Sequence, residues 1–230
     1  DSFFRPMLAA NIFDYNLQSS SRFSKLYLKS LFQDHVALPK NGIGSIAEKI
    51  VEQLDENTVL YKSKVKRITD NGVELLNGEF MESKFVLIAT NAIHANAIIG
   101  KNEMPAECSH VSTLYFSTEQ APLSKPVVML NGDNGTTLVN HVFVPTLLHS
   151  EYAPSGKHLV AVSVVKEHDL DDEELEAKCL TELSEWFGLK VMDWQLLKTY
   201  HIKYAMPFKP IVDEIEFTKK ISQHIYACGD

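Results

Sequence analysis

Two short apolar segments that end abruptly on small or polar residues constrain this chain more than any other feature. Residues 85–90 (FVLIAT) are almost wholly apolar and precede Asn91, and residues 225–230 (IYACGD) end in Gly-Asp. A nearly continuous apolar run of this length is typical of a strand that is covered on both faces. In open α/β sheets, ligands bind outside the carboxyl ends of the strands. The two segments therefore predict a sheet whose carboxyl edge faces a ligand.

The residues from Leu38 onward lead into the first of these segments. Pro39 and the pair Gly42/Gly44 break the chain before a predicted helix with one apolar face, formed by Ile46, Ala47, Ile50, Val51 and Leu54. Short strands are predicted next at residues 58–61, 64–68 and 73–76. The turns Asp70-Asn71-Gly72 and Asn77-Gly78 tolerate positive φ and favour hairpins. The sequence thus predicts a β-meander that leads into strand 85–90.

The rest of the chain alternates between helical and strand-like patterns. Helices are predicted at residues 22–33, 92–99 and 169–187, and the Arg5-Pro6 step disfavours helix at the start. Strands are predicted at residues 111–117, 127–130, 137–144, 159–165 and 194–204, and Ala205-Met206-Pro207 is expected to end the last one. This mixture predicts an α+β fold with a mixed β-sheet flanked by helices.

Composition excludes several classes of protein. The 230 residues are 45% hydrophobic and 23% charged, which is an ordinary globular balance. The formal charge of −8 argues against a nucleic-acid surface or an anionic membrane surface. No apolar run approaches the roughly 20 residues that span a bilayer, and no signal peptide is visible. The three widely spaced cysteines favour a reducing, cytoplasmic location, whereas the oligomeric state stays open.

Neither the cysteines nor the histidines have the spacing of a metal site. The three cysteines, Cys108, Cys179 and Cys228, are far apart and form no CxxC pair, so neither a disulfide framework nor a zinc site is predicted. The nine histidines make no HExxH or HxH pattern. No GxSxG elbow is present, and a hydrolase triad would have to meet in space rather than in sequence. Spacing alone therefore identifies no catalytic residues.

At this point the pattern resembles a known family. The segments LPKNGIGSIAEKI, KVKRITDNGVELLNGE, KFVLIATNA and IYACGD are similar, in order and spacing, to segments of the flavin-containing amine oxidase superfamily. That superfamily includes protoporphyrinogen oxidases and carotenoid desaturases and isomerases. The resemblance implies a substrate-binding domain at residues 1–36 and 93–218. It also implies part of a Rossmann-like FAD-binding domain, with its β-meander, at residues 37–92 and 219–230.

The resemblance also implies positions for the cofactor. Val65 would meet the adenine edge of FAD through its backbone, and Ala89 and Thr90 would lie beside the cofactor at the end of their strand. Gly229 would allow close approach to the phosphate and ribityl region, and Asp230 would form a hydrogen bond there.

The residues expected near the substrate lie close to the end of the strand 194–204. Tyr200, Tyr204 and Phe208 are candidates for the substrate cavity, although core packing is at least as good an account of these aromatic residues. Lys203 could correspond to the lysine that some amine oxidases place near the flavin, and a surface lysine is the competing interpretation. No acid–base pair is required, because the flavin itself takes up the hydride equivalent from a C–N or C–C site. The catalytic residues, the electron acceptor and the identity of the substrate stay open.

One part of the family pattern is missing from these residues. The N-terminal βαβ unit with GxGxxG, which supplies most pyrophosphate contacts, is absent, and Gly42 and Gly44 alone favour a simple loop. The sequence begins without methionine and stops at Gly229-Asp230. We therefore expect a fragment of a longer FAD-dependent oxidoreductase. The fragment alone should be inactive and should bind FAD poorly or not at all.

The leading hypothesis is thus the substrate domain of an amine oxidase-like flavoprotein that acts on an amine or on an apolar polyene or porphyrinogen-like molecule. The alternative is a non-enzymatic α+β module that binds a ligand or a protein and retains the same fold. A GxGxxG upstream in the parent gene would favour the enzyme. A third hypothesis, a hydrolase with a dispersed triad, requires labelling by a serine probe, which the sequence does not lead us to expect.

Overall fold

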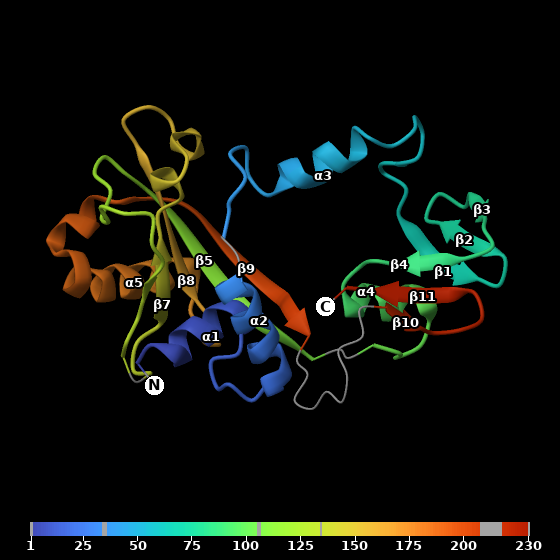
Figure 1. Cartoon of the computed structure of the whole chain (residues 1–230), viewed down its shortest axis with the longest axis horizontal. Helices are drawn as coiled ribbons and strands as arrows, with labels where there is room; N and C mark the ends of the chain where they lie inside the picture. The colour runs from blue at the N-terminus through green and yellow to red at the C-terminus, as the bar shows by residue number, and fades with distance from the viewer. Residues whose placement is uncertain (1, 34–35, 105–106, 134, 208–217, 230) are drawn as a thin grey trace. The chain divides into compact units, whose positions relative to one another are not determined.

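The computed structural model describes residues 2–33, 36–104, 107–133, 135–207 and 218–229 (Figure 1). The chain forms two compact units. Unit 1 comprises Asp1–Lys49 and Ser109–Ala205, and unit 2 comprises Ile50–Cys108 and Met206–Asp230. The two units are defined by how densely their residues pack together, and the division does not say which ligand either unit binds. The domain boundaries expected from the resemblance, at residues 36/37, 92/93 and 218/219, stay predictions.

Unit 1 is built on a five-stranded sheet in the order β6-β7-β8-β5-β9. Its strands are β5 (Cys108–Thr118), β6 (Met129–Leu130), β7 (Val139–Phe143), β8 (His158–Val164) and β9 (Gln195–Pro207). The pairs β6–β7, β7–β8 and β5–β8 are antiparallel, and Leu114 lies opposite Val162. These strands confirm the predicted ones, except that β9 continues through Ala205-Met206-Pro207 instead of ending there. An edge strand tolerates a terminal proline because its outer N–H needs no partner.

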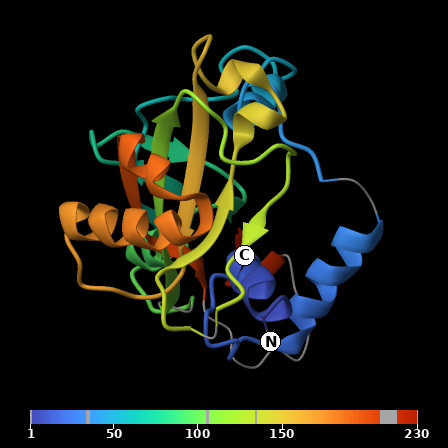
Figure 2. The same cartoon turned by 90° about the vertical axis from the view of Figure 1, so that its left-hand side faces the viewer.

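Helix α5 (Asp172–Phe187) covers one face of this sheet (Figure 2). Its buried residues Leu175, Cys179 and Leu183 follow the helical period and belong to one continuous core with side chains of β5, β7 and β8. That core includes the fully buried Leu114, Phe116, Val142, Val160, Val162 and Val164.

Two sets of hydrogen bonds hold helix α5 in place. Asp171 caps the helix by accepting from the Glu174 N–H at 2.9 Å, and the Glu174 side chain accepts from the Asp171 N–H in return. Further along, the Glu182 carboxylate accepts the backbone N–H groups of Leu138 and Val139 at 2.8 and 2.9 Å. The helix is therefore fastened directly to the start of β7.

The other helical segments of unit 1 include α2 (Ser21–Gln33) and the 3₁₀ turns η1 (Pro145–Leu147), η2 (Ser150–Tyr152) and η3 (Leu189–Asp193). Helix α3 (Gly44–Val51) begins in the residues of unit 1 and ends in those of unit 2. Ahead of α3, the side chains of Tyr152 and His149 bind the backbone carbonyls of Pro39 and Leu38 at 2.5 and 3.0 Å. The segment before α3 is thus held by the η1–η2 region of unit 1.

Helix α1 (Phe4–Ile12) corrects one expectation. The Arg5-Pro6 step was expected to disfavour helix, yet Pro6 lies in the first turn of α1. In that turn the backbone N–H groups have no partner within the helix, so the missing N–H of proline costs nothing there. The Asn140 side chain donates to the Pro6 carbonyl at 3.1 Å and ties α1 to β7.

Unit 2 contains two small sheets and helix α4 (Ala92–Ile99). The meander consists of β1 (Val65–Thr69), β2 (Gly72–Leu75) and β3 (Phe80–Glu82) in antiparallel order. It confirms both predicted turns. At Gly72 the φ angle is +152°, and a Cβ there would lie 2.0 Å from the Met81 carbonyl oxygen, so only glycine fits.

The second sheet of unit 2 has the order β10-β11-β4, formed by β10 (Thr218–Lys220), β11 (Ile225–Cys228) and β4 (Val86–Ile88). Strands β11 and β4 are parallel neighbours, and α4 follows directly after β4. Ile88, Ala95 and Ala227 form the small core of this layer.

Two expectations for unit 2 were wrong. Residues 58–61 form turns rather than a strand, and all four are exposed. The strand at residues 85–90 is shorter than expected, and it is not covered on both faces, since Phe85 is 65% and Leu87 60% exposed. Among the described residues, only the face of β4 that carries Val86 and Ile88 is packed against a core.

Candidate functional site

The carboxyl ends of β4 and β11 form one edge in unit 2. Ile225 lies opposite Val86 and Ala227 lies opposite Ile88, in parallel register. Because parallel strands end at the same edge, the register brings Ala89 and Thr90 next to Cys228 and Gly229. The structure therefore brings together three of the five residues implied as cofactor contacts: Ala89, Thr90 and Gly229.

The side chains and backbone at this edge leave room for a ligand. Ala89, Thr90 and Gly229 are all exposed. Gly229 has a φ of +127°, and no atom lies within 4 Å of where its Cβ would be. The Thr90 hydroxyl donates to the Asn91 carbonyl at 3.0 Å, and the Asn91 side chain accepts from the His94 N–H at 3.0 Å to cap α4. A helix N-terminus thus begins beside the same edge.

The two remaining implied cofactor contacts are placed differently. Val65 is the first residue of β1 in the meander, is partly exposed and pairs with Leu75. A bulge between Val65 and Arg67 interrupts the ladder there. Asp230 lies outside the described residues. The meander and the β10-β11-β4 sheet share a core through Ile68, so Val65 belongs to the same unit as the strand edge.

The residues expected at the substrate fall on two different faces of β9. Tyr200 packs edge to face on Tyr115 with 5.9 Å between the ring centroids, on the side of the sheet opposite α5. Lys203, by contrast, lines a hollow on the α5 side of the sheet together with Ser112 and His201. Tyr200 is 51% and Tyr204 46% exposed. Phe208 lies outside the described residues.

The Tyr200 face carries one further aromatic residue that sequence reasoning missed. Tyr115 of β5 is half-buried, and burial, with a smaller contribution from Tyr200, raises its pKa. It therefore stays a neutral phenol at physiological pH. Alternation within the predicted strand 111–117 would have placed Tyr115 on the other face of the strand from Leu114 and Phe116. Only the pairing of β5 with β9, however, brings Tyr115 to Tyr200.

Lys203 lines a hollow of about 400 Å³ on the α5 side of the sheet. The other residues that line it come from β5, from the β8–α5 connection and from β9: His110, Val111, Ser112, Lys166, Glu167, His168, Asp169, Leu170 and His201. Sequence reasoning identified none of them except Lys203, because their positions are separated by up to about 90 residues and share no motif.

The described residues hold no group of three or more His, Cys, Asp or Glu side chains that could bind a metal ion. All three cysteines are unpaired. Burial, with a smaller effect of Glu182, raises the pKa of Cys179 to about 12, as expected of a thiol that serves as an apolar core residue. In the part of the chain that the structure describes, the helices are too short or too polar to cross a membrane.

Comparisons with solved structures show which fold this arrangement belongs to. The chain aligns with reduced UDP-galactopyranose mutase at a TM-score of 0.67 and 14% identity, with 90% of this chain and 53% of that one covered. A protein of Pyrococcus furiosus gives 0.62 and 14%, with coverages of 83% and 46%. A putative protoporphyrinogen oxidase of Exiguobacterium sp. 255-15 gives 0.60 and 14%, with coverages of 89% and 51%. This chain therefore spans about half the length of each.

No curated protein matches the chain. The sequence model of the family described as "Flavin containing amine oxidoreductase", however, matches residues 1–216. That match takes in most of both units, from α1 past the end of β9. Together with the fold of the solved structures, it confirms the resemblance seen in the sequence. The chain belongs to the flavin-containing amine oxidoreductase family.

Proposed function

We propose that this chain is part of an FAD-dependent oxidoreductase that removes a hydride equivalent from a C–N or C–C site of its substrate. Unit 2 would supply one edge of the cofactor site, and the sheet of unit 1 would supply the substrate surface. The observation that carries the proposal is the parallel pair of β4 and β11, which brings Ala89, Thr90 and Gly229 to one open edge in a chain of this family.

The residues at that edge fit part of a flavin site. Gly229 offers backbone without a side chain, in a conformation that L-residues rarely adopt, and open space lies where a Cβ would point. At the adjoining strand end, Ala89 and Thr90 have small side chains that leave room beside the backbone. When bound, FAD would supply the redox chemistry as the acceptor of the hydride equivalent. The residues of this chain would hold and orient it, with Val65 meeting the adenine edge and Asp230 adding a hydrogen bond.

The exposure of strand β4 also indicates that further polypeptide packs on this sheet. Parallel strands are found almost only where both faces of the sheet are covered, yet Phe85 and Leu87 are exposed here. No GxGxxG motif, which binds pyrophosphate at a helix N-terminus, occurs in the 230 residues. We therefore infer that further chain completes the cofactor site, and that these residues alone retain FAD weakly.

The aromatic face of β9 is the proposed substrate surface. Tyr200 and Tyr204 are aromatic and about half exposed, and Tyr115 holds Tyr200 edge to face. Aromatic side chains of this kind suit an amine or an apolar polyene or porphyrinogen-like molecule. Lys203 lines the hollow on the α5 side of the sheet, so it does not share the surface of Tyr200.

The test is the visible absorption spectrum of the longer parent protein, purified beside this 230-residue chain. We expect oxidised-flavin bands in the parent and weak or absent bands in the shorter chain. A parent that is colourless and also rejects added FAD would overturn the proposal and leave the binding module. Bands of equal strength in both proteins would contradict the inference that further chain completes the site.

A pair of glycine variants tests the strand edge itself. Gly229→Val in the parent should weaken FAD binding about tenfold or more, equivalent to about 1.4 kcal/mol. Gly78→Val is the matched control, because Gly78 also has a positive φ of +87° and open space at its Cβ position. Equal losses of flavin from both variants would assign the effect to backbone strain rather than to the cofactor edge.

A further inference from the structure

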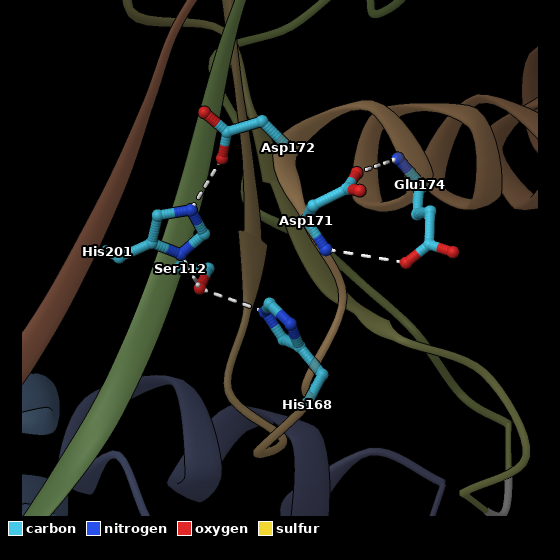
Figure 3. A network of polar contacts seen from close by, with 6 residues as sticks. All are labelled: Ser112, His168, Asp171, Asp172, Glu174 and His201. Carbon is cyan, nitrogen blue, oxygen red and sulfur yellow. Dashed lines mark hydrogen bonds and ion pairs between the residues drawn. The ribbon is translucent and has the colours of Figure 1, made fainter.

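A polar cluster on the α5 side of the unit 1 sheet joins four side chains that sequence spacing does not connect (Figure 3). The Ser112 hydroxyl of β5 lies 2.9 Å from His201 Nδ1 of β9 and 3.0 Å from His168 Nε2 of the β8–α5 connection. His201 Nε2 lies 2.7 Å from the Asp172 carboxylate in the first turn of α5. A serine, a histidine and an aspartate thus follow one another at hydrogen-bond distances.

The partners of each atom allow an arrangement of the protons that suits a nucleophile. The Asp172 carboxylate only accepts, so His201 Nε2 carries a hydrogen and donates to it. Neutral His201 then accepts from the Ser112 hydroxyl at Nδ1. The Ser112 oxygen in turn accepts from His168 Nε2–H. Every hydrogen bond of the cluster is satisfied in this arrangement when both histidines are neutral.

The state of His168 agrees with that assignment. Burial, and after it the neighbouring His201, lower the pKa of His168 against smaller opposing effects of Asp169 and the Leu170 backbone. Its Nδ1 atom is buried and has no hydrogen-bond partner. The lowered pKa favours the neutral ring of His168, and its Nε2 atom lies within hydrogen-bond distance of the Ser112 oxygen.

We propose that Ser112 is an activated nucleophile, and that the hollow beside it is a second, hydrolytic site for small uncharged esters. His201 is the general base, and Asp172 positions its ring. His168 Nε2–H is the donor nearest to the point of attack, and Lys203 lines the same hollow. Side chains of both signs surround the hollow, including Lys166, Lys203, Glu167 and Asp169, so an uncharged substrate is favoured.

The reaction conserves atoms and electrons with water as the only co-reactant. The Ser112 oxygen attacks the ester carbonyl while its proton passes to His201 Nδ1. The bond from the acyl carbon to the alkoxy oxygen breaks, and His201 returns the proton so that the alcohol leaves. Water then attacks the acyl-serine with His201 again as base. The serine oxygen regains a proton, and a carboxylic acid is released.

The first experiment is labelling of the 230-residue chain with a fluorophosphonate probe, with the modified residue located by mass spectrometry. We expect modification at Ser112. Ser163 is the internal control, because it lies on the adjacent strand β8 and is equally buried, 8% against 7% exposed. His141 lies opposite it on β7, but no hydrogen bond joins the Ser163 hydroxyl to that ring. A folded chain that shows no labelling, or labelling at Ser163 instead, would overturn the proposal.

Variants then separate reactivity from a purely structural role of the cluster. His201→Gln should slow labelling about 100-fold or more, because general base catalysis is lost. Asp172→Asn should slow it roughly tenfold, since an exposed carboxylate interacts more weakly than a buried one. Ser163→Ala should leave the rate unchanged. If His201→Gln and Asp172→Asn lower the thermal midpoint but not the labelling rate of the folded chain, the cluster only stabilises the fold and the proposal fails.

Turnover of p-nitrophenyl acetate measures the complete cycle. The unmodified chain should release nitrophenolate continuously, and Ser112→Ala should abolish release above the buffer rate. A single burst without turnover would contradict the deacylation step.

Discussion

The two units differ in the size of the buried core beneath their sheets. In unit 1, Leu114 and Phe116 are fully buried under α5, and the core continues from there to Trp194. In unit 2 the β4 layer rests on a core of only three buried residues, and Phe85, just before β4, and Leu87 within it face solvent. The comparison indicates that unit 1 is stabilised from within, whereas unit 2 presents a surface suited to a further layer. Matched substitutions in the two units can therefore test this difference.

The largest effect is expected from truncating the same residue type in each unit. Phe116→Ala should cost about 3–5 kcal/mol of unfolding free energy because it leaves a cavity in a sealed core. Phe85→Ala should stay within about 0.5 kcal/mol, as usual for surface substitutions. Both tryptophans, Trp186 and Trp194, lie in unit 1, so their fluorescence during denaturant unfolding reports on that unit.

Hydrogen exchange at β4 reports on unit 2 in the same samples. A cost for Phe85→Ala comparable to that of Phe116→Ala would show that β4 is covered in solution, and the contrast between the units would disappear.

Acid should destabilise unit 1 through His141. Burial lowers the pKa of His141 to about 4, against 6.5 when exposed, and Asn140 Nδ2 contacts its Nδ1 atom at 3.1 Å. The unfolded chain therefore binds this proton more readily, so the stabilisation is complete above pH 6.5 and is lost as the pH falls toward 4. The shift corresponds to about 3 kcal/mol.

The pH dependence of tryptophan-detected unfolding measures this loss. His141→Gln should flatten the curve between pH 6.5 and 4, and His94→Gln, at an exposed position of unit 2, should not. If the pH dependence of unfolding is the same for His141→Gln as for the unmodified chain, the loss of stability in acid arises from other groups. His168 is then the next candidate, because its pKa is also lowered.

A smaller effect is expected from the helix caps, which occur in both units. Asp171→Ala removes the cap of α5 and Asn91→Ala that of α4, and each should cost about 1 kcal/mol. Fluorescence should detect only the first and hydrogen exchange in α4 the second. Glu173→Ala, in the same first turn of α5, is the control and should cost less than Asp171→Ala. Equal costs would assign the effect to the helix dipole rather than to the cap.

The smallest effect concerns the surface of the meander. Lys66 and Arg67 contact the Glu74 carboxylate at 2.6 and 2.5 Å, and their hydrogen bonds lower its pKa. The stabilisation is therefore present above the ordinary pKa of a glutamate and is lost on acidification, and salt weakens it. Glu74→Gln should speed hydrogen exchange in β1 at low salt only, whereas Glu82→Gln should have no effect. Faster exchange at high salt as well would indicate a packing change.

Local patterns predicted most of the fold. Helix α4, the hairpin at Asp70-Asn71 and the buried face of α5 follow from periodicity, turn residues and capping signals that lie within a few positions of one another. Helix α1 was missed because the effect of Pro6 depends on its place within the first turn. The exposure of Leu87 could not be read from sequence, since an apolar strand looks the same whether or not its second face is covered.

The candidate sites were predictable only where they coincide with such local signals. The small residues after β4 and β11 marked the proposed cofactor edge because both strands end there. The cluster around Ser112 left no signal, because it depends on the pairing of β5 with β9, nearly 90 residues apart.

The alternation of β9 has a consequence for how this sequence can change over evolutionary time. The strand gives His201 to the α5 side and Tyr200 to the other, so a one-residue insertion or deletion within β9 would exchange the two sets of side chains. Individual side chains can be replaced while the other surface is kept. The number of residues within β9 cannot drift in the same way, whereas the connection between Gly188 and Gln195 can change in length without moving the register of the strand.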